Sequence, residues 1–591
     1  MPAMKVDPRF LTEDGPQIFI GSELLLKGAL EAEGGVHLLG GYPGSPVAGF
    51  FDSMALIKDL LHEKGIRAVI NNNEALAAAM LNGSQVAGCR GVICMKSVGV
   101  HVAADALALG SLAGAHPEGG AVVIYGDDPW SDSTQVPSDS RFISRHLFIP
   151  VIEPSCAQEV KDYIDLGLQL SRRSELYTGF IMPTNLADGG GSVVCRANQY
   201  PRHNTKTLRD FQTTGIDLDK HVLLPPKTWW QEENYPERFQ RALAVARELG
   251  LNRIEHPSEG RKPIGFATSG LAHDYLVQVL WELGVLGEHP ILKFGLSYPV
   301  DGGMVRQLAR QCERIIVVEE RRGFLEEQIT EIVARDRQTG GASAAVEVWG
   351  KQFPGGLEGL PEVRGLDPSV ILERLVPLLD HLAGKSASPG VDRGAIEREL
   401  AHARATAEVE MPALPARLPS FCPGCPHRDS AGLCLEIKRK FTDPEYMSRA
   451  HGREPVDLLF HGDIGCYTML MYPPNTELMH NLSGMGLGGG TGSGMDPFIP
   501  NKQVVFMGDS TFYHSGQLAI SQAVKLGQDI TFIILDNRTT AMTGHQPTPS
   551  NEFDIIGNPT ARQDIEDVVQ GIVGPADVPV ARVDPEKRES Y

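Results

Sequence analysis

Short apolar runs alternate with helix-forming stretches through the first third of the chain. The apolar runs GVHLLG, RAVI, GVICM, AVVIYG and IPVIEP lie within residues 35–154, and the stretches 47–61 and 71–88 between them have helical composition. The middle of 71–88 is rich in Ala, the residue with the highest helix propensity. Near-continuous apolar strands separated by helices are typical of a parallel sheet that is covered on both faces. We therefore predict a first α/β domain over residues 15–195.

The same alternation returns twice further along the chain. Residues 196–260 are polar and predict a connector with one helix near 236–250, and a second α/β pattern covers 261–382. A linker at 383–420 precedes a third α/β pattern at 421–591. The last strand candidate, 578–583, is followed by almost no chain, so we expect the third domain to be truncated at its C-terminus. The predicted fold class is α/β, with several doubly wound parallel sheets.

Charge and hydropathy exclude several classes of protein. The chain has 54 basic and 74 acidic residues, which gives a formal net charge of −20 at pH 7. A chain this acidic repels the phosphates of nucleic acids and anionic membrane surfaces. No apolar run approaches the ~18 residues of a membrane span, and the N-terminus lacks the basic and apolar segments of a signal peptide. We expect a soluble, cytoplasmic protein that binds neither nucleic acid nor membrane.

The segment 503–546 contains the clearest chemical signal: a strand, a GDS turn, a helix, a second strand and a DN turn. In a right-handed βαβ unit the carboxyl ends of both strands open on one edge, so we expect Asp509 and Asn537 to lie close together. Their oxygens suit a Mg²⁺ ion that completes its coordination on a diphosphate. Ser510 and Thr511 open a helix whose free N–H groups attract phosphate. The alternative is an ordinary turn capped by Asp and Asn, but the paired spacing and the following MTGHQ favour the metal site.

These motifs resemble those of a known enzyme family. The GD-to-N segment resembles the diphosphate–magnesium motif of thiamine diphosphate enzymes. Together with CPGCPHR and GDIGC, it is similar to the large subunit of indolepyruvate ferredoxin oxidoreductases, which are 2-oxoacid:ferredoxin oxidoreductases. The similarity continues near the N-terminus in GYPGSP, NNNEALAAAM, KSVGVHVAAD and DDPWSDSTQ. It implies a pyrimidine-binding domain, a transketolase C-terminal-like domain and a diphosphate-binding domain, in that order.

The resemblance also implies roles for particular residues. It implies that Asp509 and Asn537 bind Mg²⁺ together with the backbone carbonyl of Thr539. Glu74 corresponds to the residue that hydrogen-bonds the aminopyrimidine ring of the cofactor; taken alone, an acidic residue at this place is typical of a helix N-terminus. Ser45 in GYPGSP corresponds to a loop that contacts the 2-oxoacid carboxylate. The other implied cofactor contacts are Gly465, Gly508, Ser510, Thr511, Met542 and Thr543.

Nine cysteines, an odd number at low density, argue against a disulfide framework. Cys422 and Cys425 form a CxxC pair, and Cys466 follows in GDIGC. Zinc sites usually have two paired half-sites, whereas iron–sulfur clusters accept four thiolates at looser spacing. The resemblance implies a [4Fe–4S] cluster on these three thiols, and because no Cys follows Cys466, its fourth ligand is expected beyond residue 591. Cys434 fits the apolar stripe of a helix and is predicted to be a core residue.

His427 and His545 lie in the shared motifs and are candidates for proton transfer, with a structural hydrogen bond as the alternative for each. The resemblance implies oxidative decarboxylation of a 2-oxoacid, of an aryl type such as indolepyruvate, to acyl-CoA and CO₂. Electrons would pass through iron–sulfur clusters to ferredoxin, with a smaller partner subunit in a dimer of heteromers. Two alternatives are a non-oxidative thiamine diphosphate decarboxylase or ligase and a non-catalytic scaffold with a degenerate cofactor pocket.

Overall fold

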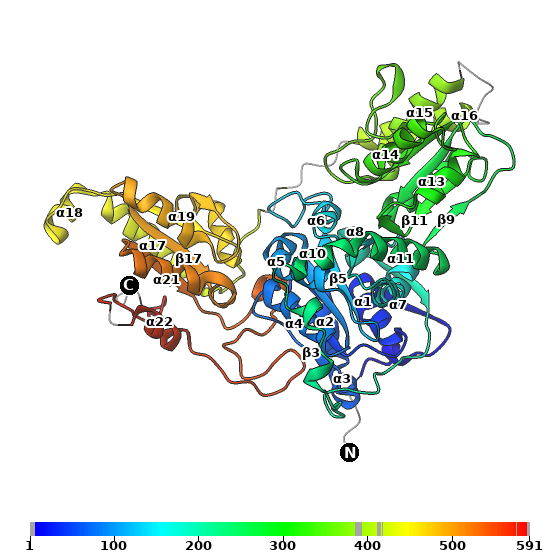
Figure 1. The fold of residues 1–591 in the computed structure, drawn as a ribbon. Coiled ribbons are helices and arrows are strands. Elements are labelled where there is room, and N and C mark those ends of the chain that lie inside the picture. The colour runs from blue at the N-terminus through cyan, green and yellow to red at the C-terminus, as the bar shows by residue number, and fades with distance from the viewer. Residues whose placement is uncertain (1–5, 384–392, 410–414, 416–417, 575, 588–591) are drawn as a thin grey trace. The chain divides into compact units, whose positions relative to one another are not determined.

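A computed structural model describes residues 6–383, 393–409, 415, 418–574 and 576–587. The chain divides into two compact units, unit 1 (Met1–Glu410) and unit 2 (Met411–Tyr591), as Figure 1 shows. Unit 1 contains two mainly parallel sheets and a small antiparallel pair, and unit 2 contains a wholly parallel sheet. The predicted α/β class with several parallel sheets is confirmed. The finer domain boundaries stay predictions, and the expected linker at 383–420 lies partly outside the described residues.

The first sheet of unit 1 has seven strands in the order β12-β6-β7-β5-β4-β2-β3. All pairs are parallel except β12 with β6. β2 comes first in the chain, and β3 and β4 lie on opposite sides of it, so the strand order reverses between β2 and β4. Ligands of open α/β sheets bind at such a switch point, outside the carboxyl ends of the strands. The strands are β2 (Leu38–Gly41), β3 (Arg67–Ala68), β4 (Arg90–Lys96), β5 (Gly120–Asp127), β6 (Val151–Ile152), β7 (Thr178–Pro183) and β12 (Leu296–Tyr298).

Apolar side chains on one face of this sheet pack against helices α4 and α5. Ile93 of β4 and Val123 of β5 share a core with Ala77 of α4 and Ala103 of α5. Helix α4 starts after Asn73, whose side-chain oxygen accepts the N–H of Leu76 at 2.9 Å, a standard N-cap. The antiparallel pair consists of β1 (Pro16–Ile20) and β8 (Gly190–Val194). The helices of this part are η1 (Pro8–Leu11), α1 (Gly21–Glu31), α2 (Gly49–Leu56), α3 (Lys58–Lys64), α4 (Glu74–Val86), α5 (Ser97–Ala113), α6 (Ser140–His146), α7 (Ala157–Ser174) and α8 (Thr184–Asp188).

The second sheet of unit 1 has the order β14-β13-β10-β11-β9, with only β9 antiparallel. Here the strand order reverses between β10 and β13. Both faces are covered: Phe266 and Ile316 pack with α12 and α15, and Ala267 and Val317 pack with α13 and α14. The elements are β9 (Asn252–Glu255), β10 (Gly265–Ser269), α12 (Gly270–Glu282), β11 (Ile291–Phe294), α13 (Gly302–Ala309), β13 (Arg314–Val318), α14 (Phe324–Thr339), β14 (Glu347–Trp349), η3 (Pro354–Gly356), α15 (Pro368–Ala383) and α16 (Arg393–Ala407).

The stretch 196–260, which we predicted to be a connector, contributes to both parts of unit 1. Strand β9 pairs with β11 of the second sheet, and the predicted helix is present as α11 (Tyr235–Glu248), which packs against α7. Its amphipathic sequence explains the packing, because Ala242 and Val245 on one side are buried. Three shorter helices precede it: η2 (Thr213–Gly215), α9 (Leu218–His221) and α10 (Lys227–Glu233).

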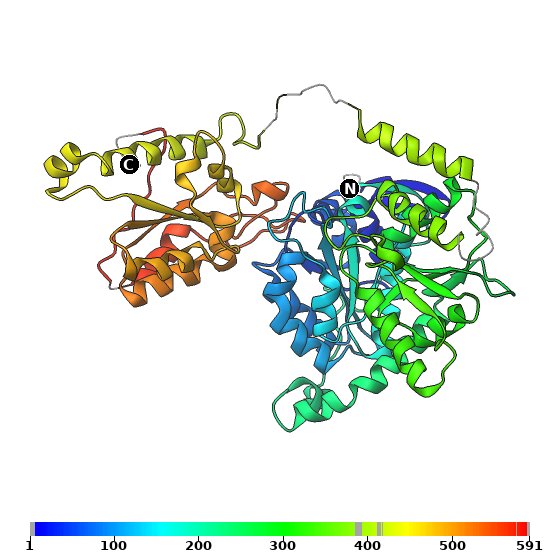
Figure 2. The same ribbon diagram turned by 90° about the horizontal axis from the view of Figure 1, so that it is seen from above.

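Unit 2 is built on four parallel strands in the order β16-β15-β17-β18. Side chains of β17 alternate: Val504 and Phe506 pack with α17, whereas Val505 and Met507 pack with α21 and α22. In Figure 2 the yellow helix α17 and the orange-to-red α21 and α22 lie on opposite sides of the sheet. The elements are α17 (Pro426–Phe441), α18 (Pro444–His451), β15 (Leu458–Gly462), η4 (Cys466–Met471), η5 (Thr476–Leu478), β16 (Asn481–Leu482), α19 (Gly488–Met495), η6 (Asp496–Phe498), β17 (Lys502–Gly508), α20 (Asp509–Thr511), η7 (Phe512–Gly516), α21 (Gln517–Leu526), β18 (Ile530–Leu535), η8 (Ala541–Thr543) and α22 (Ile565–Val573).

The prediction of a strand at 578–583 is wrong. These residues are irregular and pair with no strand among the described residues. The segment is held instead by Val580, which packs against the core beside α22, and by Arg582, which donates to Asp564 at 2.9 Å. An apolar run can therefore be buried under a helix without joining the sheet.

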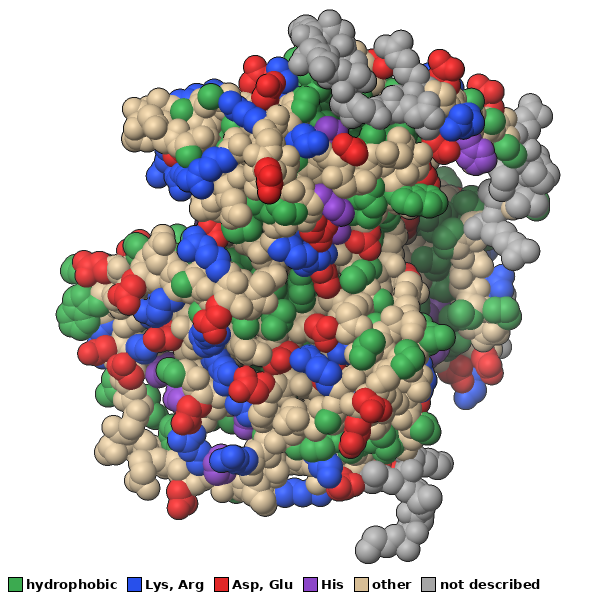
Figure 3. Space-filling model, turned by 90° about the vertical axis from the view of Figure 1, so that its right-hand side faces the viewer, with side chains coloured by type: hydrophobic (Ala, Val, Ile, Leu, Met, Phe, Trp, Pro, Cys, Tyr) green, Lys and Arg blue, Asp and Glu red, His purple; other side chains and the backbone are tan. Residues whose placement is uncertain are grey.

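Two observations bear on the excluded partner classes. No helix of the described residues is both long and apolar enough to cross a bilayer. On the face of the molecule drawn in Figure 3, acidic and basic side chains are interspersed, and no broad basic patch is visible.

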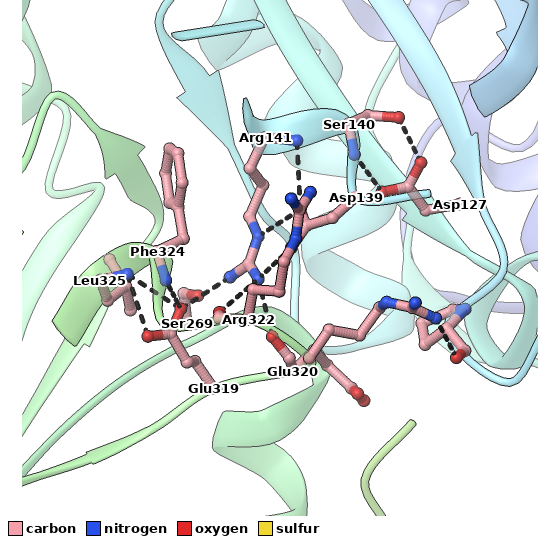
Figure 4. A network of polar contacts seen from close by, with 12 residues as sticks. Asp127, Asp139, Ser140, Arg141, Ser269, Glu319, Glu320, Arg322, Phe324 and Leu325 are labelled. Atoms are coloured by element: carbon pink, nitrogen blue, oxygen red, sulfur yellow. Dashed lines mark hydrogen bonds and ion pairs between the residues drawn. The ribbon is translucent and has the colours of Figure 1, made fainter. Parts of the chain in front are cut away.

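A buried ionic network joins the carboxyl edges of the two sheets of unit 1 (Figure 4). Arg141 of α6 donates to Asp139 at 2.8 Å. It also donates to Glu319 at 3.0 Å across the boundary between the two sheets, which we call the joint. Glu319 follows β13 and also accepts the backbone N–H groups of Phe324 and Leu325, so it caps α14. Burial alone would lower the pKa of Arg141, but the charges of Asp139 and its neighbours hold that pKa well above its usual range. The guanidinium therefore stays charged and balances the buried carboxylates.

Replacing Arg141 with Leu should destabilise unit 1 by roughly 3–5 kcal/mol, because Glu319 and Asp139 would then be buried without a cation. The measurement is urea unfolding followed by circular dichroism. Arg145→Leu is the matched control on the same helix: its partner Glu327 is 3.5 Å away and both side chains are exposed, so the loss should stay below about 1 kcal/mol. Equal losses in the two variants would contradict this account of the joint.

Candidate functional site

Acidic side chains gather at the carboxyl edge of the sheet in unit 2. Strands β17 and β18 are parallel neighbours with Gly508 opposite Leu535, so Asp509 and the turn Asp536–Asn537 follow at the same edge. This confirms the expected proximity of the two strand ends. Strand β15 ends beside them with Asp463 as its next residue. The strand order reverses between β15 and β17, so these groups lie at the switch point of the sheet.

Asp509 is a buried carboxylate at this edge. Only 1% of the residue is exposed, and among the described residues no basic side chain forms an ion pair with it. Its Oδ2 accepts a hydrogen bond from Thr548 Oγ1 at 3.3 Å. Burial, and then the charge of Asp536, raise the pKa of Asp509 to about 7. Burying a carboxylate is unfavourable unless it is paired or binds a metal, so the site fits a divalent cation.

Asn537 and Thr539 lie in the turn after β18. The Asn537 side-chain oxygen accepts the N–H of Thr539 at 3.1 Å, and the Thr539 carbonyl accepts the N–H of Ala541 at 2.9 Å. A carbonyl oxygen has two lone pairs, so each of these oxygens retains one for another partner. Together with Asp509 at the same edge of the sheet, they provide hard oxygen donors of the kind that Mg²⁺ shares with a diphosphate.

The loop after this turn is closed by hydrogen bonds between its own residues. The N–H of Thr540 donates to the carbonyl of Gln546 at 2.9 Å, and Thr543 Oγ1 donates to Gln546 Oε1 at 2.6 Å. Gln546 is buried, while Met542 and His545 are exposed at the loop tip. The predicted residues Met542, Thr543 and His545 therefore lie on one ordered loop. Gln546 and Thr548, which organise that loop, were missed by the sequence analysis.

A second buried carboxylate, Asp463, lies across the switch point from Asp509. Tyr467 donates its hydroxyl hydrogen to Asp463, and the same hydroxyl oxygen is 3.1 Å from Thr511 Oγ1. Thr511 in turn donates to the carbonyl of Ile464 at 3.0 Å. Burial raises the pKa of Asp463 to about 7. The sequence analysis missed Asp463, although its GD follows a strand just as the GD of Asp509 does.

The other predicted phosphate contacts lie at the same edge. Gly508 precedes the helical segment that starts with Asp509, and Ser510 and Thr511 are its next residues. This segment continues through a π-helical turn, Phe512–Gly516, into α21. Such turns occur frequently at functional sites. Gly465 is packed under Tyr467: a Cβ atom there would lie 2.3 Å from the ring, so no larger residue fits.

The three predicted cluster thiols share one region of unit 2. Cys422 and Cys425 flank a turn in which the Cys425 N–H donates to the Cys422 carbonyl at 3.1 Å. Burial raises the pKa of Cys466, and the thiols of Cys425 and Cys422 are close enough to raise it further. However, the described residues contain no group of three His, Cys, Asp or Glu side chains with the geometry of a metal site. Cys434 of α17 is buried in the core, as predicted.

His427 and His545 have different surroundings. His427 is buried at the start of α17 with its ring 6.2 Å from that of Phe421, and burial lowers its pKa. A neutral imidazole in an apolar setting is consistent with a packing role. His545 is exposed, with a φ of 63° at the tip of its loop. A proton-transfer role stays a prediction for both.

In unit 1 the predicted residues lie at the carboxyl edge of the first sheet. Glu74 is the first residue of α4, is only 6% exposed and rests against α5 at Gly99. A Cβ atom on Gly99 would lie 2.4 Å from Glu74 Oε1, so the glycine makes room for this carboxylate. Ser45, in the loop after β2, donates to Ser133 Oγ at 3.1 Å.

A cavity of about 30 Å³ lies beside the ionic network of unit 1, between the carboxyl edges of its two sheets. Its lining includes Glu153, Arg141, Gly270 and Glu320. This volume holds about one water molecule. Glu74 is not among its lining residues, so the cavity is distinct from the groups around Glu74.

Comparison with protein families finds two matches, one in each unit. Residues 463–589 match the family "Thiamine pyrophosphate enzyme, C-terminal TPP binding domain", a range that begins at Asp463 and includes Asp509, Asn537 and the loop to Gln546. Residues 257–401 match the "Indolepyruvate oxidoreductase domain", a range that contains every strand of the second sheet of unit 1 except β9. The chain is therefore similar to thiamine diphosphate enzymes in unit 2 and to indolepyruvate oxidoreductases in unit 1.

Curated relatives then give the particular resemblance. The chain is 28% identical to indolepyruvate oxidoreductase subunit IorA of Methanothermobacter marburgensis, over 96% of this chain and 82% of that protein. It is 29% identical to the IorA subunits of Archaeoglobus fulgidus (94% and 81% covered) and Pyrococcus horikoshii (97% and 82% covered). The predicted resemblance to indolepyruvate oxidoreductase large subunits is confirmed.

A solved structure gives a weaker match. The 2-oxoglutarate:ferredoxin oxidoreductase from Magnetococcus marinus, with 2-oxoglutarate, coenzyme A and succinyl-CoA bound, aligns with a TM-score of 0.44 at 15% identity. The alignment covers 61% of this chain and 65% of that one. A similarity at this level carries no argument about the site.

Proposed function

We propose that this protein catalyses the thiamine diphosphate- and Mg²⁺-dependent oxidative decarboxylation of an aryl 2-oxoacid such as indolepyruvate. Coenzyme A accepts the acyl group, and ferredoxin accepts the electrons. The observation that carries the proposal is the similarity to IorA subunits over nearly the whole chain. It is combined with the buried Asp509 carboxylate in the matched cofactor-binding region, which has no ion-pair partner among the described residues. The subunit name IorA also supports a smaller partner subunit, and we propose a dimer of heteromers.

Asp509, Asn537 and the carbonyl of Thr539 would hold Mg²⁺, and the helix start at Ser510 and Thr511 would bind the diphosphate. Two features support these assignments: among the described residues no basic side chain pairs with the buried Asp509 carboxylate, and Ser510 and Thr511 begin a helical segment at the switch point of the sheet. Met542, Thr543, Gly465 and Gly508 would line the cofactor.

The Glu74 carboxylate would hydrogen-bond the aminopyrimidine ring of the cofactor and share a proton with it. When bound, thiamine diphosphate supplies a carbanion that attacks the keto carbon of the substrate and stabilises the charge left when CO₂ departs. The chain's own contribution is a carboxylate that is buried, positioned by the start of α4 and given room by Gly99. Ser45 would contact the substrate carboxylate, and His427 and His545 are the proposed proton-transfer groups.

Cys422, Cys425 and Cys466 would carry a [4Fe–4S] cluster that takes the two electrons of the reaction one at a time, with the fourth ligand supplied from outside residues 1–591. The shared surroundings of the three thiols support this. A second candidate function, non-oxidative decarboxylation, is favoured by one observation: in the described residues these thiols do not form a metal-ligand group.

The iron–sulfur content separates the two functions. Anaerobically purified protein should be brown and contain iron and acid-labile sulfide in equal amounts, because three thiolates and an external ligand suffice for a cluster. Cys466→Ser should lower the iron content severalfold and abolish viologen reduction with 2-oxoacids. Cys89→Ser, in unit 1, should keep both. A colourless protein that releases CO₂ from 2-oxoacids without reducing the dye would establish the non-oxidative function instead.

Glu74→Gln should lower 2-oxoacid turnover by roughly 10²–10⁴-fold, the range of a lost general acid–base group. Exchange of the thiazolium C2 proton, followed by NMR, should slow to a similar degree, while thiamine diphosphate affinity changes little. Gly99→Ala should act in the same direction, because the added methyl group displaces the Glu74 carboxylate.

The matched control for the glycine variant is Gly83→Ala, also in a helix and with open space around the new methyl group. It should keep full activity. Normal C2 proton exchange and normal 2-oxoacid turnover in Glu74→Gln would show that Glu74 has no role in the reaction.

A further inference from the structure

The switch point of the first sheet contains a lysine that the proposed function does not use. Lys96 is the last residue of β4 and immediately precedes α5. Strand β4 pairs with β2, with Gly41 opposite Cys94, so Lys96 lies beside the loop that follows β2 and contains Ser45. A Cβ atom on Gly44 would lie 2.7 Å from Lys96 Cβ. The loop therefore packs directly on the stem of the lysine.

The hydrogen bonds at this place all meet at Ser133. The Lys96 ammonium donates to the backbone carbonyl of Ser133, and Ser45 Oγ donates to the Ser133 hydroxyl at 3.1 Å. Ser133 is itself tied to the carboxylate of Asp128, through its N–H at 2.7 Å and its hydroxyl at 3.1 Å. Ser133, a neutral residue in the loop after β5, thus accepts hydrogen bonds from Lys96 of β4 and from Ser45 in the loop after β2.

The charge of Lys96 is incompletely balanced. An ammonium has three N–H donors, yet within the described part of the chain no carboxylate lies at ion-pair distance from it. Burial lowers the pKa of Lys96, and the charge of Asp128 only partly opposes that effect. The N-terminus of α5 adds the positive end of a 17-residue helix at the next residue. The Ser97 hydroxyl there is buried and has no hydrogen-bond partner among the described residues. The electrostatics of this place therefore favour an anion.

Lys96 lies near Glu74, the residue that we assign to the cofactor. Its carboxylate rests against Gly99, three residues along α5 from Lys96. Three helical residues rise only about 4.5 Å. The backbone of Lys96 therefore lies within about one helix turn of the residue against which the Glu74 carboxylate rests.

We propose that Lys96 binds the carboxylate of the 2-oxoacid substrate, with the Ser45 hydroxyl as a second donor. In the substrate-free protein the carbonyl and hydroxyl of Ser133 occupy these two donors, and the substrate carboxylate replaces them. A single ammonium and a neutral hydroxyl match a ligand group of charge −1 better than a diphosphate. This inference rests on the proposed function, since it names the group that selects acids over aldehydes and ketones.

The test compares Lys96→Met with wild type in the holoenzyme. KM for the 2-oxoacid should rise and kcat/KM should fall about 100-fold, the effect of losing a hydrogen bond between charged groups. KM for coenzyme A, thiamine diphosphate affinity and C2 proton exchange should stay unchanged. Lys96→Arg should recover part of the loss. Lys206→Met, at an exposed lysine, is the control and should behave like wild type.

A binding measurement keeps the inference separate from the proposed function. Calorimetry with a 3-arylpropanoate, which has a carboxylate but no keto group, should show binding to wild type and about 100-fold weaker binding to Lys96→Met. The corresponding amide should bind both proteins weakly and equally. If wild type turns over no 2-oxoacid yet shows this pattern, the proposed function fails and the carboxylate site stands. Unchanged affinity in Lys96→Met, no binding to wild type, or a rise confined to KM for coenzyme A would overturn the inference.

Discussion

The structure depends on one constraint: parallel strands bring all their carboxyl ends to one edge, and at that edge this chain buries charge. In unit 2 the consequence is Asp509, a carboxylate that is 1% exposed, has its pKa raised to about 7 and lacks an ion-pair partner among the described residues. Burial of such a group opposes folding unless a cation accompanies it. The need for that cation ties the fold of unit 2 to its proposed cofactor.

The three sheets differ in how the charges at this edge are balanced. This difference distinguishes the one edge that has a structural role from the two edges to which we assign functions. Between β10 and β13 the buried Glu319 is neutralised inside the chain by Arg141 and by backbone N–H groups, so that edge forms a joint. Among the described residues, Lys96 at the first sheet and Asp509 at the third sheet both lack an ion-pair partner. The internally balanced edge encloses only a small cavity. The two unbalanced edges carry the groups that we assign to substrate and metal.

Periodicity and motif spacing predicted much of this. The apolar runs identified β4, β5, β17 and β18, because strands buried on both faces have near-continuous apolar sequence. The βαβ rule then located Asp509 and Asn537 at one edge. The run 578–583 misled because an apolar segment packed under a helix has the same pattern as a strand. Gln546, Thr548 and Lys96 were missed since their roles depend on tertiary partners that no local pattern reveals.

The most direct test of the account is a calorimetric titration of the protein with thiamine diphosphate, with Mg²⁺ and then with a chelator. The account predicts that removing Mg²⁺ weakens binding at least about tenfold, a loss of ~1.4 kcal/mol. Asp509→Asn should show the weaker affinity even with Mg²⁺ present, whereas Asp567→Asn, exposed on α22, should bind like wild type. Equal affinity in chelator and in Mg²⁺, or normal Mg²⁺-dependent binding by Asp509→Asn, would contradict the central claim.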